Sequence, residues 1–595
     1  MKNFFTSFFG SCLGVFGALV LGVLVLIGIA MSSATKSETY SSGSILKLKL
    51  ESFIPEKTDN VANNSNIFNM DQESIGLRQI LGLIEHAATD DKIVGIVLEN
   101  TSVSVGQATI KSLMDGLKKF KTSGKFIYSY ADSHSQSSYL LSSVADSMFI
   151  NPQGGVELKG YGVAIPFLKN MLDKVGVKME IFYAGNFKSA TEPFRLTEMS
   201  DYNKLQTRQF LGDLNEMMIA QVAENRKLEP AKVIEIIKNY EGRTAKSALA
   251  NNLVDGMMYS DEFDAFIRSK LGITEDKKIK TVTLSMYDAL VTLSKGSSSE
   301  GKIAIINAEG EIGYGSDEPG MISEKKFIPM LTKIRLDDKI KAVVLRVNSP
   351  GGNAFSSEMI WRELELIKKA GKPVIASFGD YAASGGYYIA AGADYIVAQP
   401  NTLTGSIGVF MMLPNATKLL NDKIGVTFDT IKTAPLAVGF SPFLDLTDRE
   451  RALLQESTDD IYKLFIERVS TGRKLSIDST KSIAQGRIWA GKRAIEIGLV
   501  DELGDLDAAI AIAAKRANLT EYKISEYPTF KEDMFQTIIK EIAKSRGGEE
   551  VSKMIKSKYE ITPEQAKLLE KLTQVKSFLR YDKPTARLPF MMDFE

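Results

Sequence analysis

A serine in a run of small residues is the first candidate for chemistry in this sequence. Ser384 lies in residues 379–388 (GDYAASGGYY), which follow a short apolar run at 374–378 and lead into a run with helical character. A turn of small residues between a strand and a helix can expose a serine hydroxyl at a sheet edge, and its glycines permit a tight bend. The same composition also fits an ordinary glycine-rich connection, so this turn alone does not establish a nucleophile.

A serine nucleophile needs a base, and the composition restricts the choice. The chain has only two histidines: His86 lies in a helical stretch, and His134 lies in a Ser-rich run that predicts a solvated loop. Lysine is therefore the best remaining base. A neutral amine requires the lysine pKa to fall from about 10.4 to about 7, a cost of about 5 kcal/mol that full burial can impose.

The two halves of the chain keep different members of such a pair. Ser384 in the second half aligns with Gln136 in the first, whereas Lys188 in the first half aligns with Ala437 in the second. Lys188 read alone is an ordinary surface lysine. The complementary losses instead predict one composite site between the halves, with Ser384 as nucleophile and Lys188 as base.

Glycines in the second half are candidates for binding an oxyanion. A tetrahedral intermediate needs backbone N–H donors. Gly351 and Gly352, which follow an apolar run, could supply one donor, and Gly385, next to Ser384, could supply another. The run at 348–352 (NSPGG) aligns with 100–104 (NTSVS), which has lost the glycines, and taken alone it also fits a simple turn.

The evidence for two halves is a repeat at a spacing near 248 residues. Residues 139–146 (YLLSSVAD) match 387–394 (YYIAAGAD), and 173–177 (DKVGV) match 422–426 (DKIGV). Further matches link 96–98 with 343–345, 123–125 with 370–372, 193–194 with 442–443, 242–243 with 486–487, and 253–255 with 499–501. Ordered matches of this kind indicate a duplicated domain.

Within each half, short β-branched runs alternate with helical patterns, which predicts an α/β fold with parallel strands and added helices. The expected strands of the second half are 303–306, 342–347, 373–378 and 395–398, with a helix at 357–370 between them. A helical region follows in each half, at 201–238 and at 447–473. The predicted organisation is a cytoplasmic tail (1–11), an anchor (12–31), a first repeat (40–293), a polar linker (294–301), a second repeat (302–520) and a helical tail of unassigned role (521–595).

The anchor is predicted from an uncharged run. Residues 12–31 would span about 30 Å as a helix, the thickness of a bilayer core. A signal peptide normally has an apolar core of only about 7–15 residues, so an uncleaved anchor is favoured, although residues 32–34 (SSA) would permit cleavage. Lys2 indicates that the first residues are cytoplasmic and the remainder is exported.

Composition excludes several other kinds of site. Of 595 residues, 44% are hydrophobic, and Lys plus Arg balances Asp plus Glu at 73 each, so no overall field would attract nucleic acid. One cysteine, Cys12, and two histidines exclude an intramolecular disulfide and a His/Cys zinc site, and we expect no metal or cofactor. Residues 296–302 imitate a phosphate loop, but Ile303 replaces the required Ser or Thr, so no nucleotide is expected.

With these motifs in view, the chain resembles the tandem-domain signal peptide peptidases of the S49 serine peptidase family. The resemblance covers roughly residues 40–520 and the anchor. The motifs that carry it are 188–190 (KSA) with 192–194 (EPF), 379–387 (GDYAASGGY) and 404–408 (TGSIG). It implies a fold similar to the Clp-protease/crotonase superfamily in each repeat.

The resemblance also implies roles and surroundings. Ser384 would be the nucleophile, Lys188 the general base, and Ser406 a hydrogen-bond partner of the lysine amine, with Gly351, Gly352 and Gly385 lining the oxyanion hole. The family is a homotetramer anchored in the bacterial inner membrane, with its bulk on the periplasmic side. It degrades signal peptides and other hydrophobic peptides left in the membrane, without ATP.

Two other functions remain open at this point. One is a crotonase-type acyl-CoA enzyme that uses the oxyanion site at Gly351-Gly352 on a thioester. The other is a membrane-anchored scaffold that binds hydrophobic peptides without cleaving them. Neither requires Ser384 or Lys188, so both predict that Ser384→Ala leaves turnover of a peptide ester unchanged.

Overall fold

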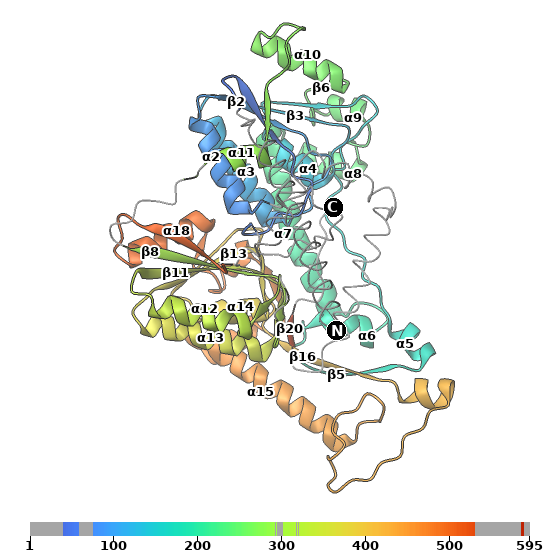
Figure 1. Ribbon diagram of the computed structural model, residues 1–595. Helices are drawn as coiled ribbons and strands as arrows, with labels where there is room; N and C mark the ends of the chain where they lie inside the picture. The colour runs from blue at the N-terminus through green and yellow to red at the C-terminus, as the bar shows by residue number, and fades with distance from the viewer. Residues whose placement is uncertain are drawn as a thin grey trace, which may run out of the picture. The chain divides into compact units, whose positions relative to one another are not determined.

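Strands and helices alternate along both halves of the chain, as the hydrophobic pattern predicts. The computed structural model (Figure 1) describes residues 40–58, 75–291, 293, 301–316, 318, 320–529 and 585–587. The predicted anchor at 12–31 lies outside these residues. No helix within the described ranges is both long enough and apolar enough to cross a bilayer.

The first half is built on a parallel six-stranded sheet in the order β6-β4-β3-β2-β1-β7. Its strands are β1 (Ser44–Leu48), β2 (Ile93–Leu98), β3 (Phe126–Ala131), β4 (Ser147–Ile150), β6 (Gly256–Met257) and β7 (Thr281–Thr283). Crossover helices separate successive strands, which is how parallel neighbours are connected.

The second half repeats this arrangement. Its strands are β8 (Lys302–Glu309), β11 (Ile340–Ser349), β13 (Val374–Ala383), β14 (Tyr395–Ala398), β18 (Glu502–Leu503) and β19 (Lys523–Tyr527), with β15 (Leu403–Gly405) and β17 (Ile488–Ala490) added at the end of β13. The order β18-β14-β13-β11-β8-β19 matches that of the first sheet strand by strand. Two tandem α/β domains of one design are therefore present, and all four strands predicted in the second half are observed.

Helices lie between the strands and on the sheets. Those of the first half are α2 (Leu77–Thr89), α3 (Gln107–Lys121), α4 (Gln136–Ser142), α5 (Lys169–Val175), α6 (Glu192–Arg195), α7 (Asp201–Arg226), α8 (Pro230–Asn239), α9 (Ala245–Ala250), α10 (Ser260–Leu271) and α11 (Leu284–Leu290). Those of the second half are α12 (Glu324–Leu336), α13 (Ala354–Lys369), α14 (Gly385–Ala390), α15 (Asp448–Arg473), α16 (Ile477–Ile483), α17 (Gly491–Ala494) and α18 (Leu506–Arg516).

The helical region expected over 201–238 consists of two helices, α7 and α8. Lys227 has φ 54 and ends α7 in the left-handed conformation, and Pro230 occupies the first turn of α8. Proline suits a helix start and cannot continue a helix from before it. The predicted helix at 447–473 is a single helix, α15, whose Thr447 and Glu450 form a capping box.

A third sheet takes strands from both halves, in the order β10-β9-β12-β20-β16-β5. Its members are β5 (Lys178–Ala184), β9 (Ile312–Gly313), β10 (Ile322–Ser323), β12 (Gly351–Asn353), β16 (Val409–Asn415) and β20 (Thr585–Arg587). β5 of the first half pairs antiparallel with β16 of the second over its whole length. This pairing holds the segment that follows β5 in the first half close to Ser384 of the second half.

Buried polar contacts also join the two halves. Glu56 and Arg346, on β11, form an ion pair at 2.8 Å with both side chains almost fully buried. Asp380, on β13, accepts hydrogen bonds from the backbone N–H and the hydroxyl of Thr109, in the first turn of α3, at 2.9 and 2.7 Å. All of these residues belong to one compact unit, which holds the described chain from Ser42 onward.

Candidate active site

Ser384 sits on a sharp turn between β13 and α14. β13 ends at Ala383 and α14 begins at Gly385, and Ser384 between them has φ 56, a conformation that is strained for a residue with a Cβ. Its N–H donates to the carbonyl of Gly405 at 2.8 Å, which ties the turn to β15. The serine is fully buried, so the fold holds its hydroxyl in one place.

Lys188 reaches this serine from the first half. It follows β5 by four residues, and β5 is fixed on β16 along seven residue pairs. Lys188 Nζ lies 2.7 Å from Ser384 Oγ, 3.0 Å from Ser406 Oγ and 3.1 Å from the carbonyl oxygen of Ser406. The structure therefore brings together three of the predicted site residues, and Lys188 and Ser384 meet within one chain.

Burial controls the charge of the amine. The Lys188 side chain is almost fully buried, and burial holds its pKa well below the ordinary value of 10.5. A neutral amine has two N–H bonds and one lone pair. The carbonyl and the hydroxyl of Ser406 can each accept a hydrogen bond from one of the two N–H groups. The lone pair of the amine is then directed at the hydroxyl of Ser384. This is the arrangement that a general base requires.

A tight turn at 485–487 locks the lysine against Ser406. The N–H of Phe187 donates to the carbonyl of Gln485 at 2.8 Å, and the N–H of Ser406 donates to the carbonyl of Arg487 at 2.7 Å. Gly486, between them, has φ 78, and a Cβ added there would lie 2.7 Å from both the Cβ and the N of Lys188. The sequence comparison identified Gly486-Arg487 as a repeat match without indicating this contact.

Gly486→Ala should therefore displace Lys188 and disable the site. The new methyl group meets backbone atoms that cannot move aside, and a misplacement of about 1 Å costs about 100-fold in rate. We expect Ser384 to react with a fluorophosphonate about 100-fold more slowly, with the fold retained by circular dichroism. Gly371→Ala is the matched control, because Gly371 has φ 81 but open space around its Cβ position. Equal slowing in both variants would show that backbone strain, not the lysine contact, is responsible.

The candidate oxyanion glycines lie on elements next to the serine. Gly385 is the first residue of α14, and Gly351 and Gly352 lie in β12, which packs against α14. The N–H of Gly351 donates to Ser349 Oγ at 3.2 Å. Gly352 lies so close to Ile312 that no side chain fits there. Their role in binding an oxyanion remains a prediction.

His134 is not a solvated loop residue, and that prediction was wrong. The histidine is completely buried, its Nδ1 lies 2.8 Å from Ser138 Oγ, and burial lowers its pKa to about 3. The Ser-rich run leads into α4: Ser135 caps this helix, and His134, just before it, forms an isolated β-bridge with Val156. His134 therefore has a structural place in the first half, where its side-chain partner is Ser138.

No group of three or more His, Cys, Asp or Glu side chains in the described part of the chain is arranged to hold a metal ion.

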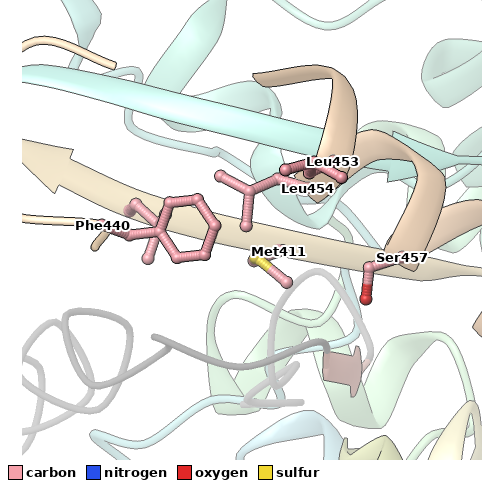
Figure 2. Close-up of a pocket in the computed structure, with 6 residues that line it drawn as sticks. Met411, Phe440, Leu453, Leu454 and Ser457 are labelled. Atoms are coloured by element: carbon pink, nitrogen blue, oxygen red, sulfur yellow. The ribbon is translucent and has the colours of Figure 1, made fainter. Parts of the chain in front are cut away.

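A pocket with mostly apolar lining side chains lies between β16 and α15. Its lining residues are Met411, Leu413, Phe440, Leu453, Leu454 and Ser457 (Figure 2). Neither Ser384 nor Lys188 lines this pocket.

Comparison with known proteins gives consistent matches along most of the chain. The model of peptidase family S49 matches residues 119–273 and 367–520, so one match contains Lys188 and the other Ser384. "Protease 4" of Salmonella typhi is 34% identical over 522 residues, covering 85% of this chain and 84% of its own; "Protease 4" of Haemophilus influenzae is 33% identical over 518 residues with the same coverage. "Putative signal peptide peptidase SppA" of Enterococcus faecium is 38% identical over 241 residues, which is 40% of this chain and 69% of that protein.

Proposed function

From the premise that the chain belongs to peptidase family S49 and is a serine endopeptidase, we propose that Ser384 and Lys188 form its catalytic dyad. The observation that carries the proposal is the 2.7 Å contact between Lys188 Nζ and Ser384 Oγ in a fully buried setting. Within the described residues, the buried amine of Lys188 contacts Ser384 and Ser406 and no carboxylate. A thioester enzyme or a peptide-binding scaffold gives no reason to bury a lysine in this way against a serine on a strained turn.

The mechanism is acyl transfer. Lys188 accepts the proton of Ser384 as Oγ forms a bond to the carbonyl carbon of the peptide. The carbonyl oxygen becomes an oxyanion, for which the proposed donors are the N–H groups of Gly351, Gly352 and Gly385. The intermediate expels the amine, which takes the proton from Lys188. A water molecule, activated by the same lysine, then hydrolyses the acyl-enzyme.

Ser406 is a positioning residue in this scheme. Its carbonyl and hydroxyl both face Nζ of Lys188, and its N–H is held by Arg487. By accepting hydrogen bonds from both N–H groups of the neutral amine, Ser406 orients the lone pair toward Ser384. It also offers a hydrogen-bond acceptor when the amine becomes protonated during acylation.

We further propose that the enzyme is anchored in the bacterial inner membrane by residues 12–31 as a homotetramer, with its catalytic bulk on the periplasmic side. Its substrates would be signal peptides and other hydrophobic peptides left in the membrane, cleaved without ATP. The support is the uncharged run at 12–31, the family membership and the name of the Enterococcus faecium relative.

The proposed function is tested with the detergent-solubilised full chain and synthetic peptides. We expect cleavage within the apolar core of a signal peptide in the absence of ATP, detected by mass spectrometry of the products. A charged peptide of equal length should remain largely uncut. Equal cleavage of both peptides would contradict the proposed substrate class, and hydrolysis of an acyl-CoA without peptide cleavage would contradict the peptidase assignment.

A further inference from the structure

A glutamine on α7 contacts the chain on both sides of Lys188. Gln206 lies in the second turn of α7, and its side chain is almost fully buried. Its amide nitrogen, Nε2, donates to the carbonyl oxygen of Phe187 at 3.0 Å and to the hydroxyl oxygen of Ser189 at 2.9 Å. A longer contact of 3.5 Å joins Nε2 to Asn203 Oδ1. The two N–H groups of one amide therefore donate to the residue before the lysine and to the residue after it.

The oxygen of the same amide contacts the second half of the chain. Gln206 Oε1 accepts a hydrogen bond from the N–H of Ile488 at 3.2 Å. Ile488 is the first residue of β17 and directly follows the turn at 485–487. This is the turn that holds Lys188 against Ser406. One amide group thus joins the segment that carries the lysine to the segment that faces it.

Other side chains of α7 dock this helix on the second half. Phe210 packs in a buried apolar cluster with Ala383, the last residue of β13. Asp213, whose carboxylate is buried, forms an ion pair with Arg493 at 2.6 Å. These contacts do not involve Gln206, so we expect α7 to stay in place when the amide is lost.

The second half of the chain has neither the lysine nor the glutamine. Its counterpart of α7 is α15: both helices have 26 residues, begin with Asp and follow a Ser or Thr cap. In that register Leu453 stands at the place of Gln206, and Leu453 lines the pocket between β16 and α15 (Figure 2). Ala437 stands at the place of Lys188. The half that lacks the lysine therefore uses this helix position for apolar packing, and the amide accompanies the lysine.

We propose that Gln206 is a positioning residue, whose amide fixes the backbone at 187–189 so that Lys188 Nζ lies against Ser384 Oγ. The role exists only if the proposed dyad is correct, because the glutamine acts through the lysine. Without the amide, the hydrogen bonds to Phe187, Ser189 and Ile488 are lost together. Leaving buried polar groups without partners is unfavourable, so the lysine segment should shift to regain them. A shift of about 1 Å in a catalytic group costs about 100-fold in rate.

Gln206→Met tests this role, because methionine has a similar size and shape but no amide. The full chain in detergent is treated with a fluorophosphonate, and mass spectrometry gives the rate of modification at Ser384. We expect that rate to fall at least about tenfold, while the affinity for a fluorescent peptide stays within about twofold of wild type. A rate within about twofold of wild type overturns the proposal, and so does an equal loss of peptide affinity.

Gln209→Met is the matched control for this substitution. Gln209 lies on the same helix, and its amide oxygen accepts a hydrogen bond from the side chain of Arg487, not from the lysine segment. We expect Ser384 to react within about twofold of wild type in this variant. Equal slowing in the two variants would mean that the docking of α7, not the contact with the lysine segment, is responsible, and would overturn the proposal.

The same substitution in a Lys188→Met background separates positioning from a general structural role. A residue that acts through the lysine has no further effect once the lysine is gone. Lys188→Met and the double variant with Gln206→Met should therefore react within about twofold of each other. A further tenfold loss in the double variant overturns the proposal, because Gln206 would then support Ser384 directly or the fold in general.

The same measurements distinguish failure of this role from failure of the proposed dyad. A Lys188→Met chain as reactive as wild type would refute the dyad, and the role of Gln206 with it. A slow Lys188→Met chain beside a fully reactive Gln206→Met chain would overturn the role of Gln206 alone.

Ser189→Ala is a second variant that removes less. It deletes one acceptor of the Gln206 amide and keeps the backbone and Cβ of the residue, so we expect a folded chain by circular dichroism. Ser384 should react at least about threefold more slowly, and this loss should also disappear in the Lys188→Met background. A Ser189→Ala rate equal to that of wild type overturns the proposal, even if Gln206→Met fails to fold.

Discussion

Ser384→Ala should lower kcat for a peptide substrate by at least about 1,000-fold and leave the affinity for that peptide within about twofold of wild type. The hydroxyl oxygen is the atom that forms the acyl-enzyme, so its loss removes the covalent path, whereas the rest of the chain, including every residue that would bind the peptide, is unchanged. Steady-state kinetics give kcat, and equilibrium binding of a fluorescent peptide gives the affinity.

Ser482→Ala is the control for this experiment, because Ser482 is an exposed serine of α16. Turnover by Ser384→Ala close to that of the control would refute the assignment of the nucleophile. That result would restore the two functions that do not need a serine, the acyl-CoA enzyme and the scaffold.

Lys188→Met should abolish turnover to the same extent and at the same time make the protein less sensitive to acid. Methionine fills similar space but has no lone pair for the proton of Ser384. In wild type, the folded chain keeps the amine neutral because burial lowers the pKa of Lys188. The unfolded chain binds a proton there below about pH 10.4, so the folded state loses stability as the pH falls.

The sign and size of that effect follow from proton linkage. Between the ordinary lysine pKa of about 10.4 and the lowered pKa of folded Lys188, wild type loses about 1.4 kcal/mol of unfolding free energy per pH unit relative to Lys188→Met. Chemical denaturation at pH 10 and at pH 7 gives the unfolding free energies of the two proteins. The unfolding free energy of wild type should fall relative to that of Lys188→Met as the pH falls. Lys246→Met, which removes an exposed lysine, is the control. If the difference in unfolding free energy between wild type and Lys188→Met does not change with pH, Lys188 is protonated in the folded protein.

Much of the fold follows from local sequence pattern. The β-branched runs of the second half predicted β8, β11, β13 and β14, because strands that are buried on both faces are written as continuous apolar segments. The duplication predicted two similar sheets. The complementary substitutions Ser384/Gln136 and Lys188/Ala437 pointed to a composite site before any geometry was known, since each half alone lacks one partner.

Features that depend on distant contacts could not be predicted in this way. The burial of His134 depends on packing, not on its Ser-rich neighbours. Nothing near Gly486 in sequence shows that it touches Lys188, almost 300 residues earlier. The contact between the carbonyl of Ser406 and the amine, like the pairing of β5 with β16, also arises only when the halves fold together. The repeat match between 242–243 and 486–487 was the one sequence signal that pointed to the turn at 485–487.

The most direct test of the account is the pH dependence of fluorophosphonate reaction at Ser384, measured by mass spectrometry of the modified peptide. With a buried neutral lysine as base, the rate should rise from acid pH and reach a plateau well below pH 10.5, and Lys188→Met should react at least about 1,000-fold more slowly across the range. A wild-type rate that keeps rising to pH 10.5 without a plateau, or a Lys188→Met chain that reacts as fast as wild type, would contradict the claim that Lys188 activates Ser384.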